Sequence, residues 1–303
     1  MNYQEFVGSV TGFLRESLPY GTEFNLIPLE KNNGVILEGL TVRKEGERAA
    51  PAIYLDSYYQ EYLAGHPLRE IQETILSCCE DNSFSEHFDA DFFSDYGKVR
   101  PLVVYKLINY EKNKKLLERI PYIPFLNLAV VFYCLLPDTP VGNATVLIHN
   151  SHLDYWKITC SDLYRDAKQN TPRLLPAEIK TMAQVLSELS EGLGGAEEDE
   201  VPMYVLTNSE KALGAACILY DGMLKHCAKW LNSAYYLLPS SIHEVILVPE
   251  KVVMDSQELA VMVREINRTQ VLKTEVLSDQ IYFYSPESGK ISIVKEEKEP
   301  ARG

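Results

Sequence analysis

The chain has 303 residues, 46% of them hydrophobic and 24% charged, which is typical of a folded globular protein and excludes a disordered chain. Its length suits one large domain or two ordinary ones. The formal net charge of −14 disfavours general binding to nucleic acid or to an anionic membrane, because a surface of that sign repels phosphate groups.

The first part of the chain predicts a helix followed by an antiparallel meander. Apolar residues recur at steps of three and four from Tyr3 to Leu14, which places them on one face of a helix. The segment from Asn32 to Gly34, two asparagines and a glycine, supplies residues that accept a positive φ, as a tight turn requires. The predicted strands cover residues 24–29, 35–42 and 50–55.

The middle of the chain mixes helical and extended patterns. Two helices are expected after the meander, the second beginning at Pro67. Residues 99–108 fit either a strand or a helix, whereas 128–136 form a predicted buried strand. Ser161 and its neighbour Asp162 are expected to cap a short helix that ends near Ala167.

A boundary is predicted after the next helix. That helix is expected to begin at Pro176 and to carry apolar residues on one side, namely Ile179, Met182, Leu186 and Leu189. Residues 192–200 are rich in glycine and acid and lack an apolar period, which indicates a linker. The predicted parts are an N-terminal region 1–191, this linker, a C-terminal region 201–294 and a charged tail 295–303.

The C-terminal region alternates short strands with helices. Helices are expected around Leu224 to Leu231 and from Asp255, where Glu258 fits a capping box, to Ile266. Strands between helices, joined by short hairpins, favour an α+β fold of antiparallel sheets with packed helices and two subdomains. The expected strands cover residues 203–206, 215–220, 235–238, 244–248, 281–284 and 291–294.

Three features predict a cytoplasmic protein. The N-terminus lacks a basic region followed by an apolar run, so we expect no signal peptide. The most apolar stretch, residues 128–136, is far shorter than the roughly 20 residues that span a bilayer. The six cysteines include no Cys-x-x-Cys pair, which favours reduced thiols packed as small hydrophobes.

The segment from Leu238 to Glu244 holds a nucleophile, a base and an acid. A nucleophilic hydrolase needs a hydroxyl bonded to an imidazole that a carboxylate orients. In an extended strand, Ser241 and His243 share a face and Glu244 points to the other, so the acid would have to come from elsewhere in the chain. The alternative is a structural turn in which a backbone carbonyl satisfies His243.

A second candidate cluster runs from His149 to Asp154. The imidazoles of His149 and His152, three residues apart, could bind a transition metal on one turn of helix, with Asp154 nearby. The spacing differs from His-Glu-x-x-His, and the sequence shows no third ligand. The alternative is a helix start that Asn150 or Ser151 caps.

Several stretches together resemble one family of bacterial proteins. They are Lys31-Asn32-Asn33-Gly34-Val35 with Ile53-Tyr54-Leu55, then Asn170-Thr171-Pro172-Arg173-Leu174-Leu175-Pro176, then Tyr204-Val205-Leu206-Thr207-Asn208, Gly214-Ala215-Ala216 and Leu238-Pro239-Ser240-Ser241-Ile242-His243-Glu244-Val245. The chain resembles an uncharacterised clostridial-type family known only as a domain of unknown function. The resemblance implies a bacterial cytoplasmic protein and assigns no reaction, cofactor or active-site residue.

The sequence therefore predicts a non-catalytic protein that acts through protein or small-ligand contacts, without a cofactor. No catalytic motif is present, and the 19 tyrosines suit both cores and binding surfaces. The first alternative is a hydrolase that uses Ser241 and His243. The second alternative is a metal-binding protein that uses His149 and His152.

Overall fold

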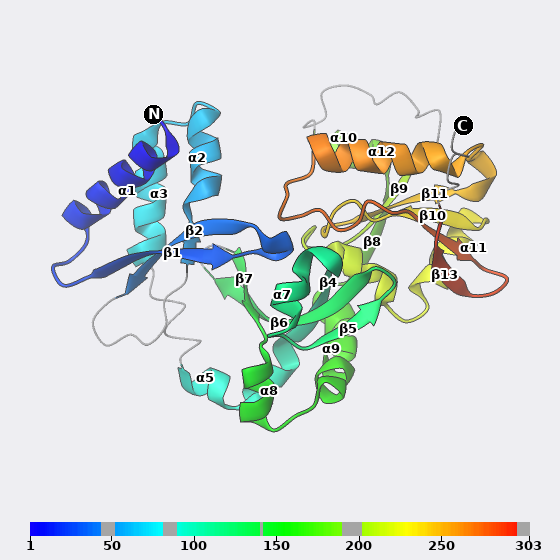
Figure 1. The fold of residues 1–303 in the computed structure, drawn as a ribbon, viewed down its shortest axis with the longest axis horizontal. Coiled ribbons are helices and arrows are strands. Elements are labelled where there is room, and N and C mark those ends of the chain that lie inside the picture. Colours follow the sequence, from blue (N-terminus) through cyan, green and yellow to red (C-terminus); the bar gives the residue numbers. More distant parts are fainter. Residues whose placement is uncertain (44–51, 81–89, 140–141, 190–201, 296–303) are drawn as a thin grey trace, which may run out of the picture.

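A computed structural model describes residues 1–43, 52–80, 90–139, 142–189 and 202–295. Within them the chain forms three antiparallel sheets with helices packed against them, which confirms the α+β prediction. No helix in these ranges is both long and apolar enough to cross a membrane. The N-terminal helices stand at the left of Figure 1, and α12 lies over the largest sheet at the upper right.

Helices and strands alternate along the described chain. The α-helices are α1 (Tyr3–Ser17), α2 (Leu55–Leu63), α3 (Leu68–Glu80), α5 (Ala90–Ser94), α6 (Tyr96–Val99), α7 (Lys114–Leu117), α8 (Asn150–Trp156), α9 (Cys160–Leu174), α10 (Met182–Leu189), α11 (Met223–Leu231) and α12 (Ser256–Thr269). The 3-10 helices are η1 (Asn32–Gly34), η2 (Arg100–Leu102), η3 (Glu111–Asn113), η4 (Gly214–Leu219) and η5 (Glu250–Val252). The strands are β1 (Glu23–Glu30), β2 (Ile36–Arg43), β3 (Ala52–Tyr54), β4 (Val103–Asn109), β5 (Tyr122–Phe125), β6 (Leu128–Thr139), β7 (Gly142–Leu147), β8 (Ala177–Thr181), β9 (Tyr204–Asn208), β10 (Tyr235–Leu238), β11 (Val245–Pro249), β12 (Tyr282–Ser285) and β13 (Lys290–Ile293).

The N-terminal helices pack on a three-stranded meander, sheet A (β1–β2–β3). Helix α1 begins with a capping box, in which Asn2 and Glu5 satisfy each other's backbone N–H groups. The turn between β1 and β2 is η1, where Asn33 has φ 62° and Gly34 has φ 69°. The predicted helix, meander and left-handed turn are therefore confirmed.

Sheet B (β4, β5, β6 and β7) forms the centre of the molecule. Strand β6 pairs with all three of the others. Strand β4 is buried along almost its whole length, with Lys106 as its half-buried exception. The ambiguous segment 99–108 is therefore a strand from residue 103 on, whereas Val99 ends α6 and residues 100–102 form η2. Helix α9 packs against β4, and its Thr171 accepts a hydrogen bond from the backbone N of Tyr105 at 3.1 Å.

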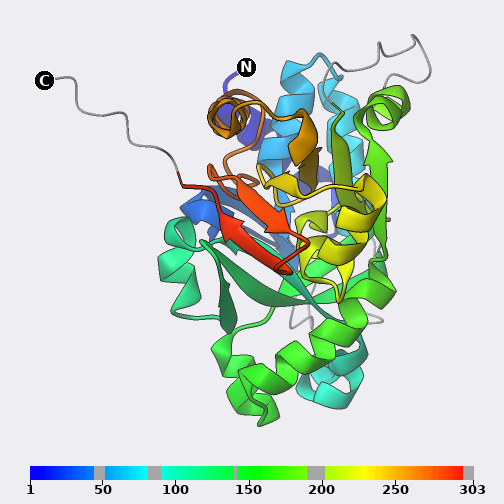
Figure 2. The same cartoon turned by 90° about the vertical axis from the view of Figure 1, so that its right-hand side faces the viewer.

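Sheet C has the strand order β13–β12–β10–β11–β9–β8. Apolar side chains of α12 cover one of its faces, while the other face joins sheet B, α9, α11 and η4 in the largest core cluster. In the turned view, the closing hairpin β12–β13 (red) lies toward the viewer and α9 (green) runs below it (Figure 2). The two larger sheets therefore share one hydrophobic core.

Three local predictions were wrong. Of residues 215–220, expected as a strand, all but Tyr220 lie in the 3-10 helix η4, whose first residue, Gly214, packs into a site with no room for a side chain. The helix expected to begin at Pro176 begins at Met182, because residues 177–181 pair with β9 as strand β8. Helix α9 does not end near Ala167 but continues to Leu174, and its cap is Thr159 with Asp162.

The predicted boundary 192–200 lies outside the described residues, as do residues 296–303 of the predicted tail 295–303. Strand β8 precedes that boundary in the sequence, and β9 follows it. The two pair from Ala177 opposite Asn208 to Thr181 opposite Tyr204. The division into two regions stays a prediction.

Gly214 provides a test of this packing. A Cβ built on it would clash with Thr207 Oγ1 and lie 2.5 Å from the carbonyl O of His243. We expect Gly214→Ala to lower the free energy of unfolding by about 1–3 kcal/mol or more, because backbone atoms must move. Urea denaturation measures the change.

In α1, Gly8 has no atom within 4 Å of such a Cβ, so Gly8→Ala should raise the free energy of unfolding by up to about 1 kcal/mol. If the two substitutions change the free energy of unfolding equally, the close packing around Gly214 does not contribute to stability as described.

Candidate functional site

Ser241 lies in the connection between β10 and β11 and is 5% exposed. Its Oγ accepts a hydrogen bond from the backbone N of His243 at 3.0 Å. Its backbone bridges to Val276. The segment forms a turn between β10 and β11, as the expected strands 235–238 and 244–248 imply, and Ser241 stabilises it by bonding to the backbone two residues on.

The imidazole of His243 has other partners than Ser241. Its Nδ1 accepts a hydrogen bond from the backbone N of Leu213 at 3.2 Å, and its Nε2 lies 3.4 Å from a carboxylate oxygen of Glu275. A single tautomer with the proton on Nε2 satisfies both contacts. The hydrogen bond between hydroxyl and imidazole that a hydrolase requires is thus not formed, and His243 instead ties two loops together.

Glu244 lies beside a hollow of about 280 Å³. It is half-buried, and burial raises the pKa of its carboxyl even though Ser241 hydrogen-bonds to it. At the rim, the carboxylate of Glu188 lies 2.8 Å from the ammonium groups of both Lys180 and Lys211. Lys180 also lies 3.3 Å from a carboxylate oxygen of Glu178, so both ammonium groups at the rim are paired with carboxylates of the described residues. The remaining lining is Met182, Val185, Val205, Thr207 and Ile246.

The predicted metal ligands lie at the start of α8. The backbone N of His149 donates to Nδ1 of His152 at 3.0 Å, and the two rings stand perpendicular with centroids 5.7 Å apart. The ring of His152 stacks on Trp156, while Asp154 is exposed. Burial lowers the pKa of both histidines. The described residues contain no group of three or more His, Cys, Asp or Glu side chains that could hold a metal ion.

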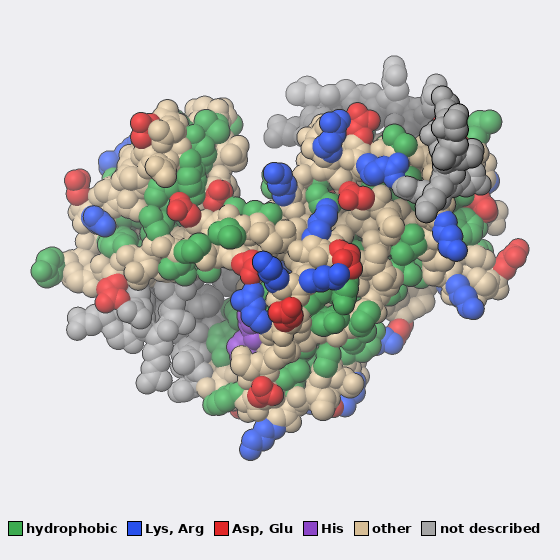
Figure 3. All heavy atoms as spheres, in the orientation of Figure 1, with side chains coloured by type: hydrophobic (Ala, Val, Ile, Leu, Met, Phe, Trp, Pro, Cys, Tyr) green, Lys and Arg blue, Asp and Glu red, His purple; other side chains and the backbone are tan. Residues whose placement is uncertain are grey.

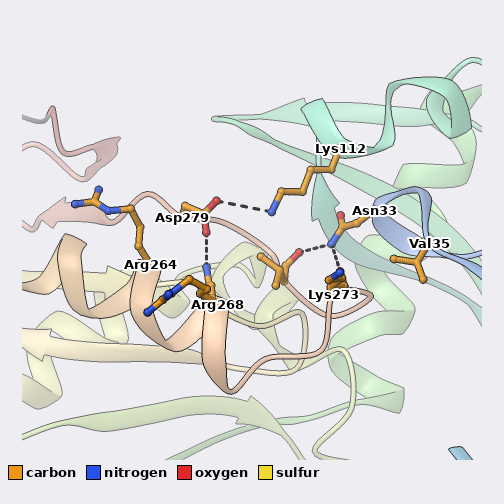
Figure 4. Close-up of a pocket in the computed structure, with 9 residues that line it drawn as sticks. Asn33, Val35, Lys112, Arg264, Arg268, Lys273 and Asp279 are labelled. Atoms are coloured by element: carbon orange, nitrogen blue, oxygen red, sulfur yellow. Dashed lines mark hydrogen bonds and ion pairs between the residues drawn. The ribbon is translucent and has the colours of Figure 1, made fainter. Parts of the chain in front are cut away.

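A second hollow, the basic pocket, has a volume of about 480 Å³ and was not predicted (Figure 4). It lies where η1, η3 and α12 meet the segment that follows α12. Four cationic side chains contribute to its walls. The lining residues are Asn33, Val35, Lys112, Arg264, Asn267, Arg268, Lys273, Val276 and Asp279.

The side chain of Asn33 holds the walls of the basic pocket together. Its Nδ2 donates to the carbonyl O of Lys273 at 2.9 Å and of Val276 at 2.7 Å. Its backbone N donates to Oδ1 of Asn113 at 2.7 Å, and Nδ2 of Asn113 returns a bond to Oδ1 of Asn33 at 2.9 Å. The left-handed conformation of Asn33 lets one residue reach both walls.

Two of the four cations that line the basic pocket have no ion pair with the described residues. Asp279 lies 3.7 Å from the ammonium of Lys112 and accepts a hydrogen bond from Asn267 at 2.8 Å. Arg268 and Lys273 form no ion pair with a carboxylate of the described ranges. Arg264 and Arg268 project from successive turns of α12, as Figure 4 shows. Near the centre of the face drawn in Figure 3, Lys and Arg side chains lie beside several carboxylates.

The sequence held only part of the signal for this pocket. The turn at Asn32 to Gly34 was predicted. The residues around it do not reveal that the side-chain amide of Asn33 bonds to Lys273, 240 positions away in the sequence. Lys112 belongs to the densest basic stretch of the chain, which also carries acids and suggests a solvated surface. The cations of α12 and of the segment after it are spaced through an ordinary amphipathic pattern.

Comparison with known proteins identifies one family. The model of a family of unknown function, DUF5688, matches residues 3–286. Neither a curated protein nor a solved structure matches the chain. These comparisons assign no site residue, so the geometry alone carries the functional argument.

The raised pKa of Glu244 gives a pH-dependent prediction. The folded protein binds the proton of this carboxyl more tightly than the unfolded chain, whose value is near 4.5, so its stability contribution falls as pH rises above that value. Glu244→Gln removes this loss and can still bond to Ser241. We expect the variant to have a higher urea midpoint than the wild type at pH 8 and the same midpoint at pH 4.

The matched control is Glu287→Gln, at an exposed position in the turn between β12 and β13. In the Glu287→Gln protein, the urea midpoint should change between pH 4 and pH 8 by the same amount as in the wild type. A Glu244→Gln protein that is less stable than the wild type at pH 8 would show that the charged carboxylate stabilises the fold.

Proposed function

We propose that this chain, which belongs to the family of unknown function DUF5688, binds a small anionic ligand in the basic pocket. The chain is then a bacterial cytoplasmic ligand-binding protein, with neither nucleic acid nor a membrane as its partner. Its role is binding rather than catalysis, since the basic pocket holds no nucleophile and base in contact.

The observation that carries the proposal is the charge imbalance. Four cationic side chains and a single carboxylate line the basic pocket, in a chain whose formal net charge is −14. Arg268 and Lys273 have no carboxylate partner among the described residues. A bound anion would pair with these two charges, so the arrangement favours a ligand of negative charge.

The size and chemistry of the basic pocket narrow the ligand class. Its volume of about 480 Å³ lies within the range of small-molecule sites. Guanidinium groups bind phosphate or carboxylate oxygens through paired N–H donors, and an ammonium adds a point charge. We infer a phosphorylated or polycarboxylate metabolite, with Arg268 and Lys273 as the principal contacts because no carboxylate of the described chain competes for them.

Pyrophosphate is a direct probe of the basic pocket. Isothermal titration at low ionic strength should show saturable binding that weakens as salt is added. The double change Arg268→Gln and Lys273→Gln should weaken binding by about tenfold or more, because two charge-assisted contacts are lost. Both side chains are exposed, so we expect the thermal unfolding temperature to change little.

A charge-matched control separates the basic pocket from general electrostatics. Lys225 and Lys229 are exposed on α11 and do not line the basic pocket. Changing both to glutamine removes the same net charge and should leave pyrophosphate affinity within about twofold of the wild type. If the two double variants lose affinity equally, or if the wild type binds neither pyrophosphate nor citrate, the proposal fails.

A further inference from the structure

Lys106 lies in the middle of β4, on a face of sheet B that carries mainly apolar residues. It stands opposite Val131 of β6. Val131 and Ile108 belong to one buried apolar cluster, and Val104 and Tyr133 belong to another. Lys106 is half-buried, so most of the residue is withdrawn from bulk water while part of it stays exposed.

A second lysine adds its charge to this environment. Lys31 ends the segment between β1 and η1, and η1 lies against β4. Its ammonium lies 3.4 Å from the centroid of the Tyr54 ring, and that of Lys106 lies 5.7 Å from the centroid of the Tyr133 ring. Neither ammonium has a carboxylate of the described segments within ion-pair distance. Aromatic faces are thus their available stabilising partners.

Burial and the nearby charge of Lys31 both favour the neutral amine of Lys106. Burial, and then the charge of Lys31, lower its pKa to about 8. At pH 8 about half of this amine is therefore unprotonated, whereas an ordinary lysine is almost fully charged. A lysine that is desolvated or placed beside another cation is activated as a nucleophile in this way.

We propose that Lys106 forms an imine with the carbonyl group of a small aldehyde or ketone that also carries a phosphate or carboxylate group. The lone pair of Nζ adds to the carbonyl carbon, and the resulting carbinolamine loses water to leave the C=N bond. This condensation needs no oxidant or reductant. The ammonium of Lys31 acts as a positioning group, because its charge attracts the anionic part of the molecule toward Lys106.

This site is separate from the basic pocket. Neither Lys31 nor Lys106 lines that pocket. Imine formation at Lys106 therefore adds a covalent mode of ligand capture to the reversible anion binding proposed above, and the two proposals can fail independently.

The test uses pyridoxal 5′-phosphate, an aldehyde that carries a phosphate group, as the probe. The full chain is treated at pH 8 with less than one equivalent of probe, and borohydride then reduces the imine to a stable secondary amine. Peptide mass spectrometry maps the modified lysines. We expect Lys106 to be labelled faster than the exposed Lys225 by about tenfold or more, because far more of its amine is neutral.

Four controls make the result decisive. Lys106→Arg keeps the charge and should abolish the preferential label. Lys31→Gln should slow labelling of Lys106, and Arg268→Gln with Lys273→Gln should leave it unchanged. Urea-unfolded wild type should show no preference among its lysines. Labelling of Lys106 no faster than of Lys225 in the folded wild type, or an equal preference in the unfolded chain, would overturn the proposal.

Discussion

The side-chain amide of Asn33 is the interaction on which the binding site depends. Asn33 sits at the tip of sheet A in a left-handed conformation, and its Nδ2 donates to two carbonyl groups of the segment after α12. The neighbouring Asn32 donates to the carbonyl O of Thr274 at 2.7 Å. These bonds join parts of the chain some 240 residues apart. Without them, the cations of α12 and the segment that follows would have no opposite wall.

His243 also joins distant segments through its side chain. Its imidazole joins the loop before η4 to Glu275, so it stabilises the segment whose carbonyl groups receive the Asn33 amide. The buried Ser241 contributes a local backbone contact rather than a nucleophile. A cluster that resembles catalytic machinery in the sequence thus contacts the segment behind the basic pocket. The partners of Ser241 and His243 are backbone N–H groups and the carboxylates of Glu244 and Glu275.

Sequence reasoning succeeded where the determining interactions are local. The left-handed turn at Asn32 to Gly34, strand β10 and the buried strand β6 all follow from residues close in sequence. It failed where a partner distant in the sequence determines the secondary structure. Residues 177–181 have an apolar spacing that fits a helix, but they pair with β9 as a strand. The basic pocket was missed for the same reason, since its walls come from three separate parts of the chain. The spacing of apolar residues predicts single helices and strands, whereas a pocket forms where several of these elements pack together.

The central claim is that the Asn33 amide assembles an anion-binding pocket, and Asn33→Gly tests it most directly. Glycine adopts the same positive φ without strain, so the variant keeps the backbone turn and removes the side-chain bonds. Isothermal titration with pyrophosphate should show affinity reduced by about tenfold or more, because the wall that carries Lys273 loses its anchor. An Asn33→Gly protein that binds pyrophosphate as tightly as the wild type would contradict the account.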